Sequence, residues 1–328
     1  MISLNGGIKI GSFFSLDPTV KSELAVVSHA HSDHIKAHDK IIATAPTLDL
    51  ARLQYKRFID HQLNYDTKMA IGPATVELKS AGHMLGSSQI IVEFYDERIV
   101  YTGDFKFEKN LTCQQAEAHE CDILLIDTTY GKPRYKFPPL EECRQRLLEF
   151  VDKQLRAGLT PIILAYSFGK SQEAMKILSD SGIEFEAHSL AYQAALIYIK
   201  HGVDINGLHE LGEKPSGDKP VIMPPNFLRY ADTRGWNRFR TCFLSGWIID
   251  KHQGRSGPNG YGIPFSDHAS FEDIIKYVEI ASPRKIYTLF GPPDIAEFLN
   301  KMGFNATAAH FNSGHNLSNR NAINLELL

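Results

Sequence analysis

The chain has 328 residues, of which 43% are hydrophobic and 22% charged, and its formal net charge is −3. This is enough apolar material for one large domain or two smaller ones. No run of eighteen apolar residues is present, which excludes a membrane-spanning helix, and the first residues do not resemble a signal peptide. The negative charge excludes a uniformly positive surface, so nucleic-acid binding would need local basic patches.

The four cysteines are widely spaced, and none forms a C-x-x-C pair. A disulfide framework or a zinc ribbon is therefore not expected. Reduced thiols are typical of the cytoplasm, which is the location that we predict.

The first 130 residues are rich in predicted strands. The stretch "ELAVVSHAH" predicts a strand running into a polar loop, and "HDKIIATAPTLDLARLQYKRF" a strand followed by a helix from about Pro46. Further strands are predicted in "ATVELKSAGHML", "SSQIIVEFYD", "RIVYTGDF" and "CDILLIDTTYG". Histidines and aspartates follow several of these strands, where a rigid sheet holds loops that carry chemistry.

The pattern changes near Pro138. "PLEECRQRLLEFVDKQLRAG" has helical spacing, and "LTPIILAYSFGKSQEAMKILSDSG" predicts a buried strand, a turn and a helix. A helix in "SLAYQAALIYIKHG" and strands in "KPVIMPPNF" and "RTCFLSGWIID" follow. This alternation predicts a parallel α/β unit. After the glycine-rich "KHQGRSGPNGYG", a loop, a helix, a strand and a last helix near residues 294–302 are expected.

The stretch "VSHAHSDHIKAH" places His29, His31, Asp33 and His34 on one short turn. Imidazole and carboxylate ligands suit Zn²⁺ or Mn²⁺, and the lack of cysteine argues against a purely structural zinc site. The alternatives are a polar surface loop or histidines that cap a helix.

Two later residues extend this pattern. His83 and Asp104 each follow a predicted strand and a glycine, which lets the backbone pass close to a bound ion. Taken alone, the first is a loop histidine and the second a turn aspartate.

The order H-x-H-x-D-H, then His83, then Asp104 resembles the metallo-β-lactamase fold family. The resemblance implies an α/β fold, an αββα sandwich, with two divalent metal ions. It implies Zn²⁺ at the first site and Zn²⁺, Mn²⁺ or Mg²⁺ at a weaker second site. It assigns His29, His31 and His83 to the first ion, Asp33 and His34 to the second, and Asp104 to a bridge between them.

Two further motifs resemble the β-CASP nucleases of this family. "IDTTYG" is similar to their motif A and gives Asp127, and "PFSDHAS" is similar to motif B and gives His268. The resemblance implies a β-CASP α/β domain at 140–252, inserted between metallo-β-lactamase parts at 1–139 and 253–328. The chain looks most like the ligase-associated DNA exonucleases of prokaryotes, which are relatives of the Artemis-type DNA repair nucleases.

If the chain hydrolyses phosphodiester bonds, three of these residues would have catalytic roles. Asp33 would accept a hydrogen bond from the attacking water, and His268 would contact the scissile phosphate or protonate the leaving oxygen. Asp127 would orient His268. Taken singly, Asp127 is a helix or turn cap and His268 a loop histidine.

Two stretches are candidates for contacting the substrate. "RYADTRGWNRFR" interleaves cations and aromatic rings, which bind phosphates and stack on bases, although a solvated helix with core aromatics has the same pattern. A second anion contact is predicted at the start of the helix after "SFG". The candidate residues are Arg229, Arg234, Trp236 and Arg238 in the first stretch, and Lys170 and Ser171 in the second.

One position departs from many β-CASP enzymes. Phe290 stands where their motif C histidine adds to the second metal site. Artemis-type DNA nucleases also place an apolar residue there, which favours DNA as the substrate and predicts weaker binding of the second ion.

The function that we predict is a metal-dependent DNA exonuclease of DNA repair. The alternative is an RNA-processing nuclease, like ribonuclease J or the cleavage and polyadenylation endonuclease, and a non-catalytic nucleic-acid-binding subunit is a third reading. The expected partners are nucleic acid and a DNA ligase or helicase of a repair pathway, with no membrane.

Overall fold

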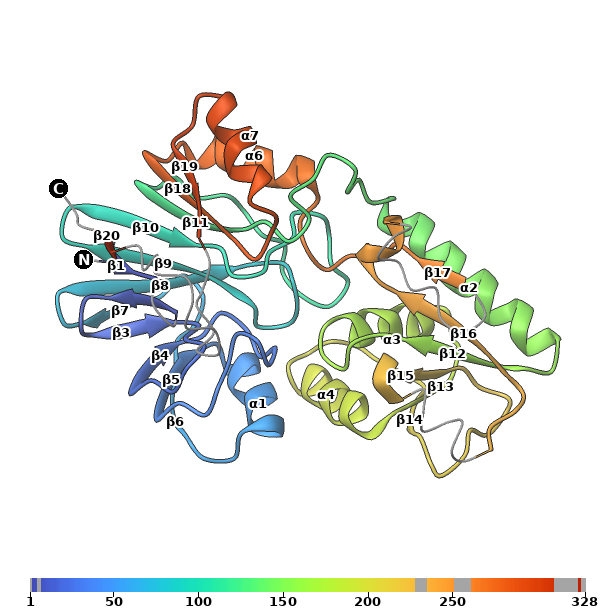
Figure 1. The fold of residues 1–328 in the computed structure, drawn as a ribbon. Helices are drawn as coiled ribbons and strands as arrows, with labels where there is room; N and C mark the ends of the chain where they lie inside the picture. Colours follow the sequence, from blue (N-terminus) through green and yellow to red (C-terminus); the bar gives the residue numbers. More distant parts are fainter. Residues whose placement is uncertain (1, 5–6, 228–234, 251–260, 310–323, 326–328) are drawn as a thin grey trace. The chain divides into compact units, whose positions relative to one another are not determined.

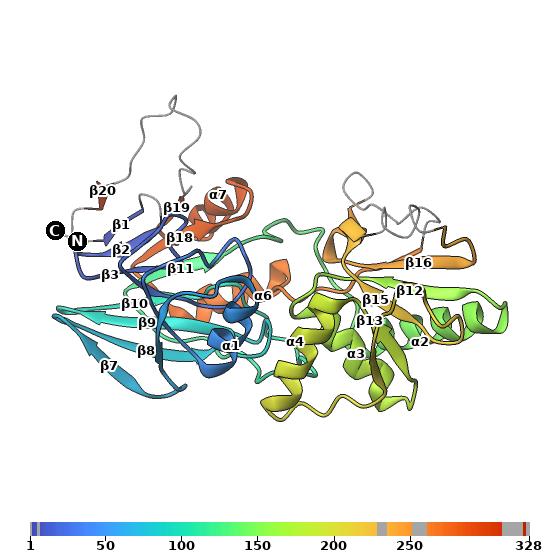
Figure 2. The ribbon, with the colours of Figure 1, turned by 90° about the horizontal axis from the view of Figure 1, so that it is seen from below.

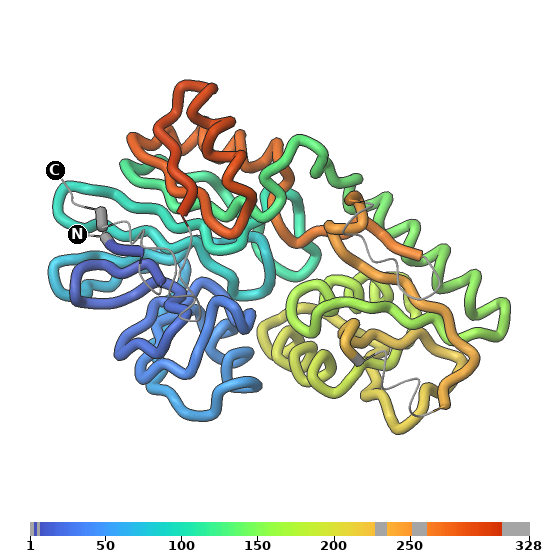
Figure 3. The backbone as a smooth tube through the Cα atoms, viewed as in Figure 1, coloured from blue at the N-terminus to red at the C-terminus, as the bar shows by residue number. Residues whose placement is uncertain are grey.

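The computed structural model describes residues 2–4, 7–227, 235–250, 261–309 and 324–325. The chain divides into two compact units (Figure 1). The first comprises Met1–Glu108, Gln114–Pro133 and His268–Leu328, and the second Lys109–Cys113 and Arg134–Asp267. Figure 3 shows that the N-terminal strands and the C-terminal helices belong to the same unit. Among the described residues, no helix is both long and apolar enough to cross a membrane.

The first unit is built on two seven-stranded sheets. In order, the first sheet contains β20 (Asn324–Leu325), β1 (Ile2–Ser3), β2 (Ile8–Ile10), β3 (Phe14–Leu16), β4 (Leu24–Val26), β5 (Lys40–Ala43) and β6 (Ile59–Gln62). The second contains β19 (Ala306–Ala308), β18 (Lys285–Leu289), β11 (Ile123–Asp127), β10 (Glu97–Tyr101), β9 (Ser88–Phe94), β8 (Ala74–Ser80) and β7 (Lys68–Ile71).

Three apolar clusters show how the first unit is layered. One cluster joins the two sheets, with Val26 from the first sheet and Leu125 from the second. A second places α1 (Ala45–Gln54) on the outer face of the first sheet, and a third places α6 (Phe271–Ala281) and α7 (Asp294–Lys301) on the second. Figures 1 and 2 show these helices on the outside of the sheets. The predicted αββα sandwich is confirmed.

The second unit contains a sheet of six parallel strands. In order, the strands are β14 (Leu208–Glu210), β13 (Phe185–Ala187), β15 (Val221–Met223), β12 (Thr160–Leu164), β16 (Phe239–Leu244) and β17 (Tyr261–Ile263). The helices that pack on it are α2 (Leu140–Arg156), α3 (Lys170–Asp180) and α4 (Ser189–Lys200). The 3₁₀ turns are η1 (Pro225–Phe227) and η2 (Gly246–Ile249). The predicted parallel α/β unit is confirmed.

Helix α6 begins at a capping box. The Ser270 hydroxyl accepts from the Asp273 amide at 3.2 Å, while the Asp273 carboxylate accepts from the Ser270 amide at 3.0 Å. Together they satisfy amides that the first helical turn leaves without partners. The helix therefore starts at a defined residue immediately after the loop that carries His268.

Candidate metal centre and active site

The strand order of the second sheet gathers several predicted site residues at one edge. Strands β10, β11 and β18 are parallel neighbours, so their carboxyl ends point the same way. Asp104 follows β10, Asp127 is the last residue of β11, and Phe290 follows β18 directly. The histidine loop leaves β4 of the other sheet.

A close approach of two loops requires glycine at one position. Gly103 precedes Asp104 and has φ +53°, and a Cβ there would lie 2.8 Å from the Cβ of Ser28. Side chains other than hydrogen are strained in this conformation. Gly103 therefore lets the Asp104 loop reach the histidine loop.

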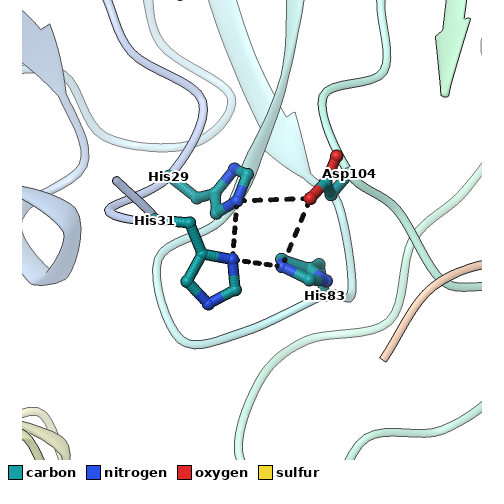
Figure 4. Close-up of side chains that lie close together, drawn as sticks. All are labelled: His29, His31, His83 and Asp104. Carbon is teal, nitrogen blue, oxygen red and sulfur yellow. Dashed lines mark hydrogen bonds and ion pairs between the residues drawn. The ribbon is translucent and has the colours of Figure 1, made fainter. Parts of the chain in front are cut away.

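Three histidines and one aspartate converge on a common point (Figure 4). His29 Nε2 lies 3.1 Å from His31 Nδ1, which lies 3.2 Å from His83 Nε2. Asp104 Oδ2 lies 3.4 Å from His29 Nε2 and 3.7 Å from His83 Nε2. The side chains of His29 and His83 are fully buried, and that of His31 is half-buried.

Hydrogen bonds behind the cluster set which nitrogen of His29 faces it. The Ser28 hydroxyl donates its proton to Asp17 Oδ2, so it accepts from His29 Nδ1, 2.9 Å away. The Nε2 lone pair of His29 therefore points toward the other ligand atoms, as in metal-binding histidines whose second nitrogen is hydrogen-bonded.

His34 lies beside His29, with the two ring centroids 4.2 Å apart, and contacts the other oxygen of Asp104. Its Nδ1 donates to Asp17 Oδ2 at 2.7 Å, and its Nε2 lies 3.3 Å from Asp104 Oδ1. Asp33 Oδ2 lies 3.8 Å from the same Nε2, with its side chain 78% exposed. The two carboxylate oxygens of Asp104 thus face different groups of histidines, and Asp33 lies at the solvent side.

Burial and charge act against one another in this cluster. Burial lowers the pKa of His29 well below its ordinary value, and the neighbouring His34 adds to this effect. Burial also disfavours charge on His34 and Asp104, but each stabilises the charged form of the other. The pKa of His34 is therefore raised and that of Asp104 is lowered. A metal ion bound here would replace the proton of His34.

His268 and Asp127 form a pair beside the cluster. His268 Nδ1 donates to Asp127 Oδ2 at 3.0 Å, which turns Nε2 toward Asp104 Oδ2, 3.8 Å away. The other carboxylate oxygen of Asp127 accepts from the Thr129 amide at 2.8 Å and from its hydroxyl at 2.6 Å. Asp127 is thereby held in one orientation with an oxygen free to bind the imidazole.

The sequence analysis missed the residues behind the ligands. Asp17 is buried and accepts from the Ser28 amide at 2.7 Å and the Tyr101 hydroxyl at 2.8 Å, in addition to His34. Its signal in the sequence, an Asp-Pro pair after a short strand, is weak. Thr129 has a clearer signal, because D-x-T is typical of a turn in which the aspartate accepts from the residue two positions later.

Comparison with known proteins identifies several proteins that are similar to this chain in sequence. No protein-family profile matches it. It is 30% identical over 298 residues to the "Probable DNA ligase" of Opitutus terrae, covering 89% of this chain and 29% of that protein. It is 34% identical over 144 residues to the "Uncharacterized protein in lig 3′region" of Acidianus ambivalens, covering 43% of this chain and 99% of that protein. It is 24% identical to the "5′ exonuclease Apollo" of Danio rerio, covering 82% of this chain and 48% of that protein.

The chain belongs to the β-CASP branch of the metallo-β-lactamase fold. It spans less than half the length of the ligase-named relative and of Apollo.

Metallo-β-lactamase folds imply divalent metal ions, and the cluster fits them. Donor atoms held about 2.0–2.1 Å from a tetrahedral zinc ion lie about 3.4 Å from one another. The four contacts between neighbouring donors of the first cluster range from 3.1 to 3.7 Å. His34 and the second oxygen of Asp104, with Asp33 nearby, offer fewer and more oxygen-rich ligands for a second ion.

Phe290 lies beside this second group. Its ring is 5.1 Å from the ring of His34, and 46% of the side chain is exposed. Phe290, which the sequence analysis assigned to motif C, therefore lies beside the second group without offering a ligand atom.

The predicted substrate contacts in the second unit differ in exposure. Arg238 is exposed, whereas Trp236 is buried in an apolar cluster with Ile162 and Met223. Arg229 and Arg234 lie outside the described residues.

Lys170 and Ser171 point into the unit. Lys170 Nζ lies 2.8 Å from Asp267 Oδ1, and the Ser171 hydroxyl donates to the Tyr166 carbonyl oxygen at 2.6 Å. Their burial does not support a direct contact with phosphate.

Proposed function

We propose that this chain hydrolyses phosphodiester bonds of nucleic acid, as an exonuclease that acts on DNA during repair. The observation that carries the proposal is the His268–Asp127 pair beside the histidine–aspartate cluster. In a purely structural metal site, protein ligands fill every coordination position. Such a site has no use for an additional imidazole beside it, as His268 is here. A relative named as a 5′ exonuclease supports the choice of reaction.

The ligands follow from the two groups of contacts. His29, His31, His83 and Asp104 would hold the first ion, and Asp33, His34 and Asp104 the second. Two such ions would clamp a phosphate, lower the pKa of water and offset the charge on the leaving oxygen. Zn²⁺ suits the imidazole-rich first group, and Zn²⁺, Mn²⁺ or Mg²⁺ the second.

The protein's own groups orient the substrate and move protons. His268 Nε2 faces the cluster, where it can bind a phosphate oxygen or donate a proton to the leaving oxygen. Asp127 holds the ring through Nδ1 and stabilises its protonated form. Asp33, exposed beside the second group, is placed to accept a hydrogen bond from water.

DNA is favoured over RNA by two features. Phe290, which we assign to motif C, is apolar like the residue there in Artemis-type DNA nucleases, and one relative is named "Probable DNA ligase". That relative extends far beyond the matched region. A DNA ligase of the same repair pathway is therefore the partner that we propose first, with a helicase second.

A time course on single strands labelled at the 5′ or the 3′ end tests this proposal. DNA and RNA are compared with Zn²⁺, Mn²⁺ and Mg²⁺ in turn. We expect stepwise shortening of DNA from one end, which is lost in His31→Ala and kept in the control His61→Ala, whose histidine is exposed on β6. Preferred cleavage of RNA would indicate the RNA-processing alternative. Binding without cleavage under every metal would indicate a non-catalytic subunit.

A further inference from the structure

Lys170 occupies an unfavourable position for a cation. It is the first residue of α3, where the helix dipole is positive, and its side chain is buried. Its ammonium lies 2.8 Å from Asp267 Oδ1, with the two side chains 5% and 4% exposed, and 5.4 Å from the Tyr166 ring. A buried ion pair often stabilises a fold no better than well-packed apolar side chains of similar size. Its burial is therefore weak evidence that this pair serves stability.

The place of Asp267 in the chain suggests what the pair does. Asp267 is the last residue of the second unit, and its peptide bond leads directly to His268. On the other side of His268, the Ala269 amide donates to the Phe105 carbonyl oxygen at 2.6 Å. The imidazole itself is held by Asp127.

His268 is thus held at its ring and at the residue that follows, by partners in the first unit. The residue that precedes it is held by Lys170. We propose that the Lys170–Asp267 ion pair positions His268 for the reaction, with Lys170 and Asp267 acting as positioning residues. This inference rests on the proposed function for its catalytic consequence, but its structural consequence can be measured separately.

The variant must remove the ion pair without burying a lone charge. Lys170→Met alone would leave the Asp267 carboxylate buried without its cation, which is strongly destabilising. The double variant Lys170→Met/Asp267→Asn replaces both charges by neutral groups of similar size. Lys170→Arg keeps the charge. The matched control is Lys176→Met/Asp180→Asn, which removes another ion pair from the same helix.

Two readouts decide the proposal. On a short labelled strand, the double variant should lower kcat about ten- to a hundred-fold, the loss expected from a misplaced catalytic group, with KM changed less than about two-fold. Lys170→Arg should recover most of kcat. Hydrogen exchange of the Ala269 amide, which needs no activity, should be faster in the double variant than in the native protein and the control.

The outcomes separate this inference from the proposed function. If the native protein cleaves no strand, the proposed function fails, and exchange at Ala269 alone decides whether the pair positions this segment. A double variant with native kcat would overturn the proposal, as would native exchange at Ala269. Faster exchange throughout the second unit would also overturn it, because the pair would then serve stability only.

Discussion

At the scale of single residues, Asp17 connects the two groups of proposed ligands. Its carboxylate binds the imidazole of His34 directly and that of His29 through the Ser28 hydroxyl. Its backbone has φ +38°, which is unusual for a residue with a side chain. Because hydrogen-bond partners of metal-binding histidines fix the ring and raise its basicity, this one carboxylate influences both proposed sites.

We expect Asp17→Asn to lower metal affinity and hydrolysis together. An amide has one acceptor oxygen and cannot receive all the donors that Asp17 accepts. The expected loss of metal affinity is about 10- to 100-fold, and it is measured as ions per chain after dialysis against limiting metal. Asp39→Asn, at an exposed aspartate, is the control. Native stoichiometry in Asp17→Asn would contradict this role.

At the scale of elements, the end of β18 limits the second proposed site. Phe290 directly follows this strand and has φ +61°, a region where histidine is found more readily than most residues. A histidine could therefore replace Phe290 without additional backbone strain. Its imidazole would face the second group, which now has few ligands.

Phe290→His is expected to raise occupancy of the second site in the absence of substrate. The native protein should retain its first ion more tightly than its second, because the first group offers three imidazoles. Metal content after dialysis against limiting metal measures this, with Phe290→Leu as the control that adds no ligand. Two tightly held ions in the native protein, unchanged by the histidine, would show that another residue fills the motif C role.

The loop between β4 and β5 contains a histidine that is sensitive to pH. His38 is 1% exposed, and burial lowers its pKa to about 4. Its ring nitrogens lie 3.2 Å from the Ser22 amide and 3.1 Å from the Lys36 amide. A neutral ring accepts from one of these two amides and a protonated ring from neither, so the fold favours neutral His38.

The contribution of His38 to stability should therefore be lost as the pH falls. Its folded pKa lies below the ordinary 6.5, so the contribution is complete above pH 6.5 and disappears between pH 6.5 and about 4. Over this window the native protein should lose about 3 kcal/mol more free energy of unfolding than His38→Gln. Denaturant titrations at several pH values measure the difference. Parallel pH dependences of the two proteins would contradict it.

At the scale of the whole molecule, a net charge of −3 requires any nucleic-acid contact to be local. Arg238 is exposed just before β16, and of the three arginines that were named as candidate substrate contacts it is the one that the structure describes. Trp236 from the same stretch is part of the core, so base stacking by its ring is not supported.

Arg238→Ala should weaken binding of single strands and reduce its dependence on salt. Loss of one phosphate contact lowers the slope of log K against log salt by about 0.7. Binding is measured over a series of salt concentrations, and Arg156→Ala, at an exposed arginine of α2 paired with Asp152, is the control. An unchanged slope in Arg238→Ala would identify Arg238 as ordinary surface charge.

The amino-acid sequence by itself determined the αββα class, the inserted parallel α/β unit and the residues that converge in Figure 4. Strand and helix periodicity predicted the parallel α/β unit, and the spacing H-x-H-x-D-H predicted the histidine loop, because these patterns are set by residues close together in the chain. The αββα class and the insertion of the α/β unit were implied by the resemblance to the metallo-β-lactamase and β-CASP families. The convergence of His83 and Asp104 with that loop was expected through the family resemblance and not through spacing.

Only the tertiary structure decided which side chains face inward and which partners they find. Asp17 reaches His34 and Tyr101 across 17 and 84 residues, and Lys170 meets Asp267 across the second unit. The same packing buries Trp236 and Ser171 and leaves Asp33 exposed. Such pairings depend on how sheets and helices stack, because a polar group removed from water must find a partner wherever the chain has brought one. No pattern of residues close together in the sequence predicts which partner a buried polar group will contact.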